Sequence, residues 1–102
     1  MDRKEFIKNE INQDPMDPFN YYLLAIEYQK EGMRQEAFEK FEQMITDFPD
    51  YVATYYTYAN ALLEENEEEK AEAIIHLGLK VAEEKGAAKA LKELKQLLEL
   101  NF

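Results

Sequence analysis

Two stretches of this sequence decide its fold, because one repeats the other. Residues 18–32 read PFNYYLLAIEYQKEG, and residues 52–66 read VATYYTYANALLEEN. At an offset of 34 residues, aromatic residues align with aromatic residues and small residues with small ones: Tyr21-Tyr22 with Tyr55-Tyr56, and Ala25 with Ala59. A chance match does not keep these residue types in the same order, so the alignment indicates an internal repeat.

The same offset holds outside these two stretches. It aligns further residues of the same kind: Pro15 with Pro49, Ile11 with Ile45, and Ala37 with Ala71. Because the first segment takes part in the alignment, residues 1–15 correspond to the second half of a preceding unit. The repeat therefore covers most of the chain.

Turn-forming residues divide the chain into six segments. Asp17-Pro18 is typical of an N-cap followed by proline in the first helical turn, and Asp50 is expected to cap a later helix. Residues that suit turns and helix ends stand between the other segments: Gly32, Pro49, Asn66 and Gly86. Apolar residues recur within the segments at steps of three and four. We predict an all-α fold of antiparallel hairpins, with helices over residues 3–13, 18–31, 34–47, 52–64, 68–85 and 87–100.

The helical spacing also predicts the core. In the second and third helices the inward positions are Tyr21, Leu24, Ala25, Tyr28, Ala37, Phe38, Phe41, Ile45 and Phe48. In the stretch that enters the fourth helix, the same spacing is found at Tyr51, Tyr55, Tyr58 and Ala59. The last helix does not keep the register, because the 34-residue offset would bury lysines. A shift of two residues places leucines inward instead: Leu91, Leu94 and Leu98.

Charge and composition exclude several classes of function. The chain has 12 Lys and Arg against 22 Asp and Glu, a net charge of −10, whereas a nucleic-acid surface needs clustered cations. Residues 79–102 hold five Lys and Arg against four Asp and Glu, and are therefore weakly basic beside an acidic body. Cysteine, a signal-peptide pattern and an apolar run of membrane-spanning length are absent. We expect a single domain over residues 1–102 in the cytoplasm, with no nucleic-acid or membrane partner.

The sequence offers no catalytic or metal-binding motif. Serine and cysteine are missing, and no base stands near the three threonines. His76 is the one histidine, and beside Ile74, Ile75 and Leu77 a structural role is favoured over a ligand role. The glutamate-rich run over residues 64–69 is better explained by a helix N-terminus, which favours negative charge, than by an acidic docking patch. We predict no enzymatic activity, no cofactor and no metal.

The 34-residue helix-turn-helix period resembles the tetratricopeptide repeat family. The family pattern of an aromatic, leucine, small, tyrosine, alanine, phenylalanine and proline residue is found in the first unit: Tyr21, Leu24, Ala25, Tyr28, Ala37, Phe41 and Pro49. The second unit matches it at Tyr55, Tyr58, Ala59, Leu62, Ala71 and Ile75. It departs from the pattern with Asn66 at the turn and Glu83 where proline would stand. The resemblance implies a short solenoid: a half-repeat over 1–15, full repeats over 18–51 and 52–85, and a capping helix over 87–100.

The resemblance also implies a binding surface, because the first helix of each repeat in this family lines a concave groove that often holds a peptide. The corresponding residues here are Phe19, Tyr22, Ile26, Gln29 and Lys30 in the first unit, Tyr56, Thr57, Asn60 and Leu63 in the second, and Lys89, Lys92 and Gln96 in the capping helix. The leading hypothesis is a non-catalytic scaffold that binds another protein or a peptide. The alternative is a structural protein that forms a weak homodimer through the edge of a terminal helix, near Phe6 or Phe102.

Overall fold

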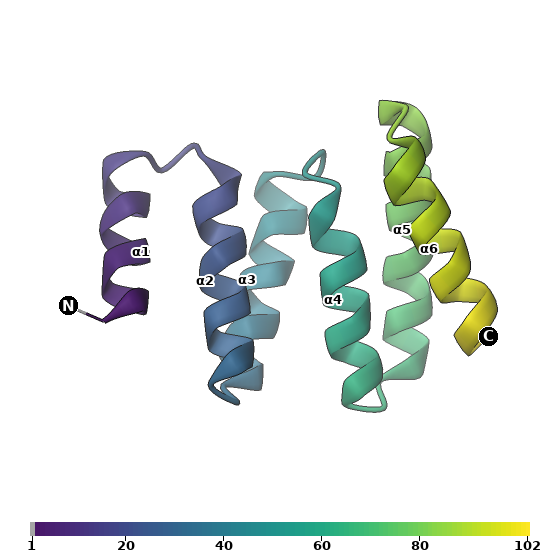
Figure 1. Cartoon of the computed structure of the whole chain (residues 1–102), viewed down its shortest axis with the longest axis horizontal. Helices are drawn as coiled ribbons and strands as arrows, with labels where there is room; N and C mark the ends of the chain where they lie inside the picture. Colours follow the sequence, from purple (N-terminus) through teal and green to yellow (C-terminus); the bar gives the residue numbers. More distant parts are fainter. Residues whose placement is uncertain (1) are drawn as a thin grey trace. The chain divides into compact units, whose positions relative to one another are not determined.

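The computed structural model describes residues 2–102, and this part of the chain consists of six α-helices joined by short turns (Figure 1). The helices are α1 (Arg3–Gln13), α2 (Pro18–Lys30), α3 (Arg34–Asp47), α4 (Ala53–Glu64), α5 (Glu68–Lys85) and α6 (Ala88–Asn101). No strand occurs within residues 2–102. The predicted all-α fold is therefore confirmed, and each predicted helix end lies within one residue of the observed end.

Most of the residues predicted to begin or end helices adopt the expected conformations. The carboxylate of Asp17 accepts a hydrogen bond of 3.0 Å from the Phe19 N–H, and Pro18 opens α2. Asn66 stands at the repeat position of Gly32, and the two share a left-handed backbone, with φ of 60° and 75°. A short polar side chain tolerates this conformation almost as glycine does, so Asn66 replaces the glycine without breaking the repeat.

The start of α4 differs from the expectation. Asp50 was expected at its N-cap, but the N-cap is Val52, without a side-chain capping hydrogen bond. After Pro49 the chain makes a backbone turn, in which the Tyr51 N–H donates to the Phe48 carbonyl at 3.0 Å. This turn carries the chain beyond Asp50 before helical geometry begins.

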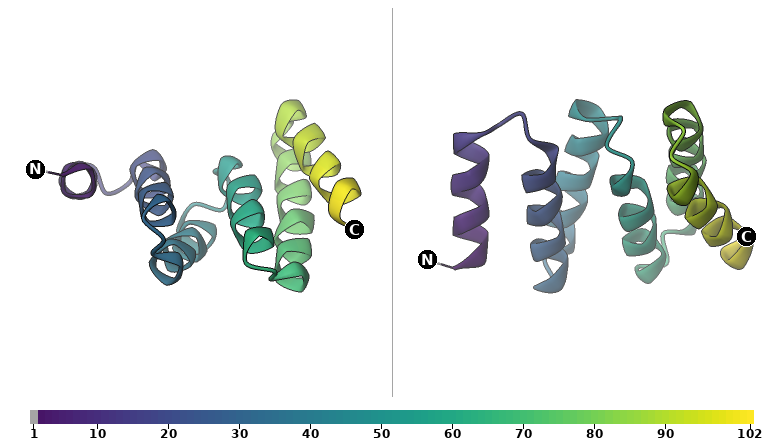
Figure 2. Two further views of the ribbon diagram at one scale, coloured as in Figure 1. Left: turned by 60° about the horizontal axis from the view of Figure 1, so that its bottom comes forward. Right: turned by 45° about the horizontal axis from the view of Figure 1, so that its top comes forward.

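The six helices form two compact units, each with its own core. Unit 1 ends at Tyr51, and within it α2 packs against both α1 and α3 (Figures 1 and 2). Unit 2 covers Val52–Phe102, and within it α5 packs against both α4 and α6, which also touch each other. A single domain over residues 1–102, with its expected repeat limits, stays a prediction.

In unit 1, apolar burial and ion pairs hold α1 to α2. Ile7 is the buried residue of α1, and Arg3 Nε lies 2.6 Å from Glu27 Oε1, a carboxylate that is itself buried. Lys4 Nζ also donates to Glu31 Oε1 at 2.9 Å. A buried carboxylate is costly without a cation partner. The ion pair with Arg3 therefore offsets part of the cost of burying Glu27.

The predicted core of unit 1 is only partly confirmed. The small residues Ala25 and Ala37 are fully buried, as the close approach of α2 and α3 requires, and so is Phe41. Several expected core residues are instead half-buried: Tyr21, Tyr28, Phe38, Ile45 and Phe48. Met44, which the sequence reasoning did not single out, is fully buried.

The core of unit 2 is tighter, because α5 carries a glycine at its centre. A Cβ atom added to Gly78 would lie 2.6 Å from the Tyr55 Cβ and 3.1 Å from the Leu94 Cδ1. Real Cβ atoms do not approach each other so closely, so only glycine lets α4 and α6 both reach α5 here. Tyr55 and Leu94, which lie against Gly78, are both buried.

The expected register shift of α6 is confirmed at Leu94 and needs correction at Leu91 and Leu98, which were both expected inward and are half-buried. Leu94 is fully buried, while Lys89 and Lys92 are exposed, as the two-residue shift requires. Leu97 is buried more deeply than Leu98, which was expected in its place and is half-buried. Positions 94 and 97 lie on the same side of α6, because a helix brings residues three apart to one side.

Candidate functional site

The α2 surface, formed by Phe19, Tyr22, Ile26, Gln29 and Lys30, lies within unit 1. These positions are spaced by three or four residues and so follow one side of the helix. Phe19 is 49% exposed and Lys30 is exposed, whereas the other three are half-buried. The structure therefore brings the five predicted residues together as a strip that is apolar in its first half and polar in its second.

A contact at the centre of this strip was not foreseen. The ring of Tyr22 packs against that of Tyr51, with centroids 5.6 Å apart and planes inclined by 58°. Burial is the main reason that the pKa of the Tyr51 hydroxyl lies above its ordinary value, and Tyr22 and the Asp17 carboxylate add to the effect. The contact with Tyr51 thus holds the ring of Tyr22 in place, while part of Tyr22 remains exposed to solvent.

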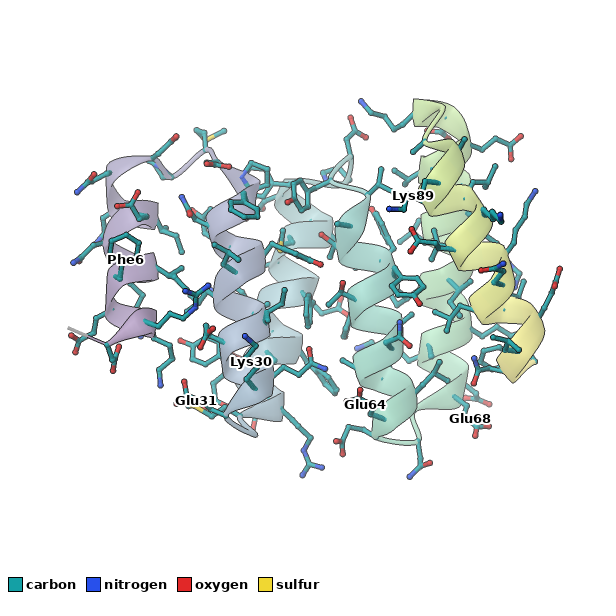
Figure 3. All side chains as sticks on the ribbon, in the orientation of Figure 1. Phe6, Lys30, Glu31, Glu64, Glu68 and Lys89 are labelled. Atoms are coloured by element: carbon teal, nitrogen blue, oxygen red, sulfur yellow. The ribbon has the colours of Figure 1, made fainter. Side chains whose placement is uncertain are left out.

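The basic end of the α2 surface is partly neutralised. Lys30 Nζ lies 3.7 Å from Glu27 Oε1, and its side chain remains 66% exposed. Figure 3 shows Lys30 and Glu31 together at the end of α2. Lys30 is thus a second cation beside the buried Glu27 carboxylate, and most of its own side chain still faces solvent.

The α4 surface, formed by Tyr56, Thr57, Asn60 and Leu63, lies within unit 2. Tyr56 is 38% exposed, although the adjacent Tyr55 is buried. The Asn60 Nδ2 donates to the Tyr56 carbonyl at 3.1 Å, which ties this amide to its own helix. Thr57, Asn60 and Leu63 are half-buried, so Tyr56 is the prominent group of the α4 surface.

The α6 surface comprises the predicted residues Lys89, Lys92 and Gln96, which are all exposed (Figure 3 labels Lys89). Lys92 and Gln96 line an open hollow of about 360 Å³, and Lys89 does not. The other lining residues were not predicted: Ala88, Leu91, Lys95 and Glu99. Their spacing along the helix from position 88 is the sequence signal that could have indicated them.

A second hollow, of about 380 Å³, lies in unit 1 and was also missed. It is lined by Pro18, Asp47, Phe48, Pro49, Asp50 and Tyr51. Sequence reasoning treated this segment as a helix break followed by a cap. The two aromatic residues that flank Pro49-Asp50 are the sequence signal that could have indicated this hollow.

The part of the chain that the structure describes contains no candidate metal-ligand cluster and no candidate membrane-spanning helix. Within residues 2–102 there is no group of three or more His, Cys, Asp or Glu residues that could hold a metal ion. His76, expected in a structural role, is exposed on α5 and does not contribute to the core. None of the helices in this part of the chain has the length and apolarity needed to cross a membrane.

Comparisons with known proteins agree with the arrangement of the helices. A family model described as tetratricopeptide repeat matches residues 28–95. A solution NMR structure of a tetratricopeptide repeat domain protein from Salinibacter ruber is 34% identical, with a TM-score of 0.82, covering 86% of this chain and 89% of that one. A crystal structure of such a domain protein from Salinibacter ruber is 33% identical, with a TM-score of 0.77, covering 83% and 94%. A search of curated proteins found no match. The chain therefore belongs to the tetratricopeptide repeat family.

Proposed function

We propose that this chain is a non-catalytic interaction module that binds a peptide or a helix of another protein on its α2, α4 and α6 surfaces. Repeats of this family generally mediate protein–protein interaction. The observation that carries the proposal is the exposure of large aromatic rings on the first helix of each repeat, with Phe19 49% and Tyr56 38% exposed. Exposed aromatic side chains that do not serve the core are typical of interaction surfaces.

The physical argument rests on adjacent tyrosines in α4. Tyr55 buries its ring in the core of unit 2, whereas Tyr56 leaves much of its ring in water. A partner that covers Tyr56 in unit 2, or Phe19 in unit 1, removes apolar surface from water at about 25 cal/mol per Å². Aromatic residues in this situation often dominate the energy of an interface.

Polar side chains on the same surfaces suit a peptide backbone. Gln29, Asn60 and Gln96 stand on α2, α4 and α6. Their amides carry donor and acceptor atoms, although the Asn60 Nδ2 already donates to the Tyr56 carbonyl, so Asn60 contributes its amide oxygen as an acceptor. An extended peptide presents an N–H and a carbonyl at each residue except proline. Amides beside exposed aromatics therefore favour a ligand with both an accessible backbone and apolar side chains.

The experiment has two stages. The immobilised chain first captures a partner from a native lysate, and calorimetry then measures the affinity of the identified partner for variants. We expect Phe19→Ala and Tyr56→Ala each to weaken binding by about fivefold or more, equivalent to about 1 kcal/mol. The control is Leu77→Ala, because Leu77 is 39% exposed on α5, outside the three surfaces. Equal losses in Leu77→Ala and Tyr56→Ala would refute the assignment.

Self-association is the second candidate, and exposed apolar residues near the terminal helices support it. Phe6 on α1 (Figure 3) and Leu100 and Phe102 at the end of α6 are exposed. Analytical ultracentrifugation over a wide dilution range separates the two functions. A dimer that dissociates on dilution, and that Phe6→Ser or Phe102→Ser weakens, would support self-association. A monomer at all concentrations would exclude it.

A further inference from the structure

The hollow in unit 1, here called the Phe48–Tyr51 pocket, has an unusual combination of lining groups. Two aromatic residues and two prolines are its apolar lining residues, and Asp47 and Asp50 are its acidic ones. Neither lysine nor arginine lines it. Its volume of about 380 Å³ lies within the range of small-ligand pockets, roughly 300–1,000 Å³. The pocket therefore has room for one side chain of a partner and has one sign of charge.

Both aromatic rings of the pocket are held in place from α2. The ring centroid of Phe48 lies 5.4 Å from that of Tyr21, and the centroid of Tyr51 lies 5.6 Å from that of Tyr22. The Tyr21 hydroxyl in turn donates to the Pro15 carbonyl at 2.9 Å. A pocket whose walls are already ordered binds its ligand without the cost of ordering them.

The electrostatic environment favours a cation. Asp47 is the last residue of α3, and a helix C-terminus carries partial negative charge. The opposing positive end of α2 is already capped, because Asp17 accepts the Phe19 N–H. Asp17 also contributes to the raised pKa of Tyr51, which shows that its negative charge acts at the pocket wall.

The chain itself pairs cations with its tyrosines. Lys40 Nζ lies 5.9 Å from the centroid of Tyr21, and Lys8 and Lys70 stand at similar distances over Tyr28 and Tyr58. Such contacts are favourable because the face of an aromatic ring carries partial negative charge. The Phe48–Tyr51 pocket offers the same ring chemistry together with carboxylates, but no cation of the chain lines it.

We propose that the Phe48–Tyr51 pocket receives the guanidinium group of an arginine side chain from the partner protein. The planar guanidinium stacks on an aromatic ring, and its N–H donors reach the carboxylates of Asp47 and Asp50. Arginine suits this site better than lysine, because it is flat, weakly hydrated and forked. The inference rests on the proposed function, and it adds the chemistry of one partner residue.

The position of the pocket connects it to the α2 surface. Pro18 lines the pocket and precedes Phe19, while Tyr22 contacts the lining residue Tyr51. A peptide that covers Phe19 and Tyr22 can therefore direct one side chain into the pocket. The expected ligand segment has an arginine next to apolar residues.

The test uses a small probe, N-acetyl-arginine methylamide, and the whole chain labelled with ¹⁵N. We expect saturable shifts of the amide signals at residues 19–22, 47–48 and 50–51, with a millimolar dissociation constant. N-acetyl-citrulline methylamide is the matched probe, because it keeps the shape and lacks the charge. Binding of citrulline as tight as that of arginine, or shifts outside these residues only, would overturn the proposal.

Variants sharpen the test without removing the fold. We expect Asp47→Asn combined with Asp50→Asn to weaken arginine binding at least fivefold, while the amide spectrum stays that of a folded chain. Glu39→Gln is the matched control, because it removes a carboxylate from the exposed surface of α3 outside the pocket. Unchanged arginine binding in the double Asn variant would contradict the assignment of the carboxylates.

The outcome is separable from that of the proposed function. Phe19→Ala and Tyr56→Ala do not alter a residue that lines the pocket, so these variants should bind the arginine probe normally and the partner weakly. If the probe fails to bind while partner binding depends on Tyr56, the pocket inference alone is wrong. If the probe binds and no partner affinity depends on Phe19 or Tyr56, the proposed function is wrong.

Discussion

Tyr21 in unit 1 and Tyr55 in unit 2 occupy the same repeat position, yet they are buried to different depths. Tyr55 is 1% exposed, whereas Tyr21 is half-buried. The difference follows the second helix of each repeat, where the 34-residue offset aligns Met44 with Gly78. Both of these residues are buried, but one has a long side chain and the other has none.

Tyr55 can be buried this deeply because Gly78 has no side chain. The backbone of α5 approaches so closely that an added Cβ would lie 2.6 Å from the Tyr55 Cβ. In unit 1, Met44 fills the equivalent position, and Tyr21 uses other partners: the ring of Phe48 and the carbonyl of Pro15. At the same repeat position, the aromatic residue is thus deeply buried beside Gly78 in unit 2 and half-buried in unit 1, where Met44 aligns with Gly78.

The largest expected effect is the difference between the two alanine variants at this position. Tyr55→Ala should lower the free energy of unfolding by about 3–5 kcal/mol, because it leaves a cavity in a closed core. Tyr21→Ala should cost less, roughly 1–3 kcal/mol, from partial burial and one hydrogen bond. Urea denaturation measures both values. Equal losses would contradict the comparison between Met44 and Gly78.

The second prediction concerns Gly78 itself. Alanine gains about 1 kcal/mol over glycine inside a helix, so a substitution without steric conflict would stabilise the chain. Here the new Cβ forces α4 and α6 away from α5, and overpacking of a core typically costs about 1–3 kcal/mol. We expect Gly78→Ala to lower the melting temperature. The control is Ala73→Gly on the exposed side of α5, which should cost only the propensity difference. A higher melting temperature for Gly78→Ala would refute the close contact.

The third prediction separates the adjacent tyrosines of the two surfaces. Tyr22 and Tyr56 are both rotated away from the core position, and sequence reasoning expects neither to matter for stability. Because Tyr22 packs against Tyr51, its replacement by alanine should cost about 0.5–1.5 kcal/mol. Tyr56→Ala should stay within about 0.5 kcal/mol of the wild type. Thermal melts of the two variants decide whether the ring contact in unit 1 is real.

The smallest effect is a pH dependence at Tyr51. Its raised pKa means that the unfolded chain ionises first as pH rises above about 10. Stability is therefore present below the unfolded pKa and declines as pH rises through the folded value. The difference in phenolate absorbance between wild type and Tyr51→Phe should appear at a pH above that of free tyrosine. Ionisation at or below the ordinary pKa would contradict the burial of Tyr51.

The helices and their order could be predicted from the sequence because local chemistry determines them. Asp17-Pro18 begins a helix, and Gly32, Asn66 and Gly86 adopt the left-handed conformation that ends one. Comparison of the two repeats then predicts which faces meet, since the same small residues recur. These signals need no knowledge of distant contacts, which is why the helix ends agree within one residue.

The features that could not be predicted depend on contacts across helices. From the sequence alone, Gly78 is expected only to weaken its helix, whereas the structure shows Tyr55 and Leu94 packed against it. Glu27 reads as a surface charge until Arg3 is found beside it. The Phe48–Tyr51 pocket arises where the ends of two helices meet, and periodicity within one helix does not indicate such a site.

The candidate surfaces could be predicted from the sequence only in part. Helical spacing places Phe19, Tyr22 and Ile26 on one side of α2, and the structure has them there. The contact of Tyr22 with Tyr51 and the hollow beside Lys92 required the folded chain. That a partner binds these surfaces stays a prediction.

One measurement tests the central claim most directly: the affinity of the captured partner for the double variant Phe19→Ala/Tyr56→Ala. The two residues lie in different units, so their effects should add. The account predicts a melting temperature near that of the wild type and binding weaker by about 25-fold, the product of two fivefold losses. A folded double variant that binds its partner with wild-type affinity would contradict the assignment of the exposed aromatics to partner binding.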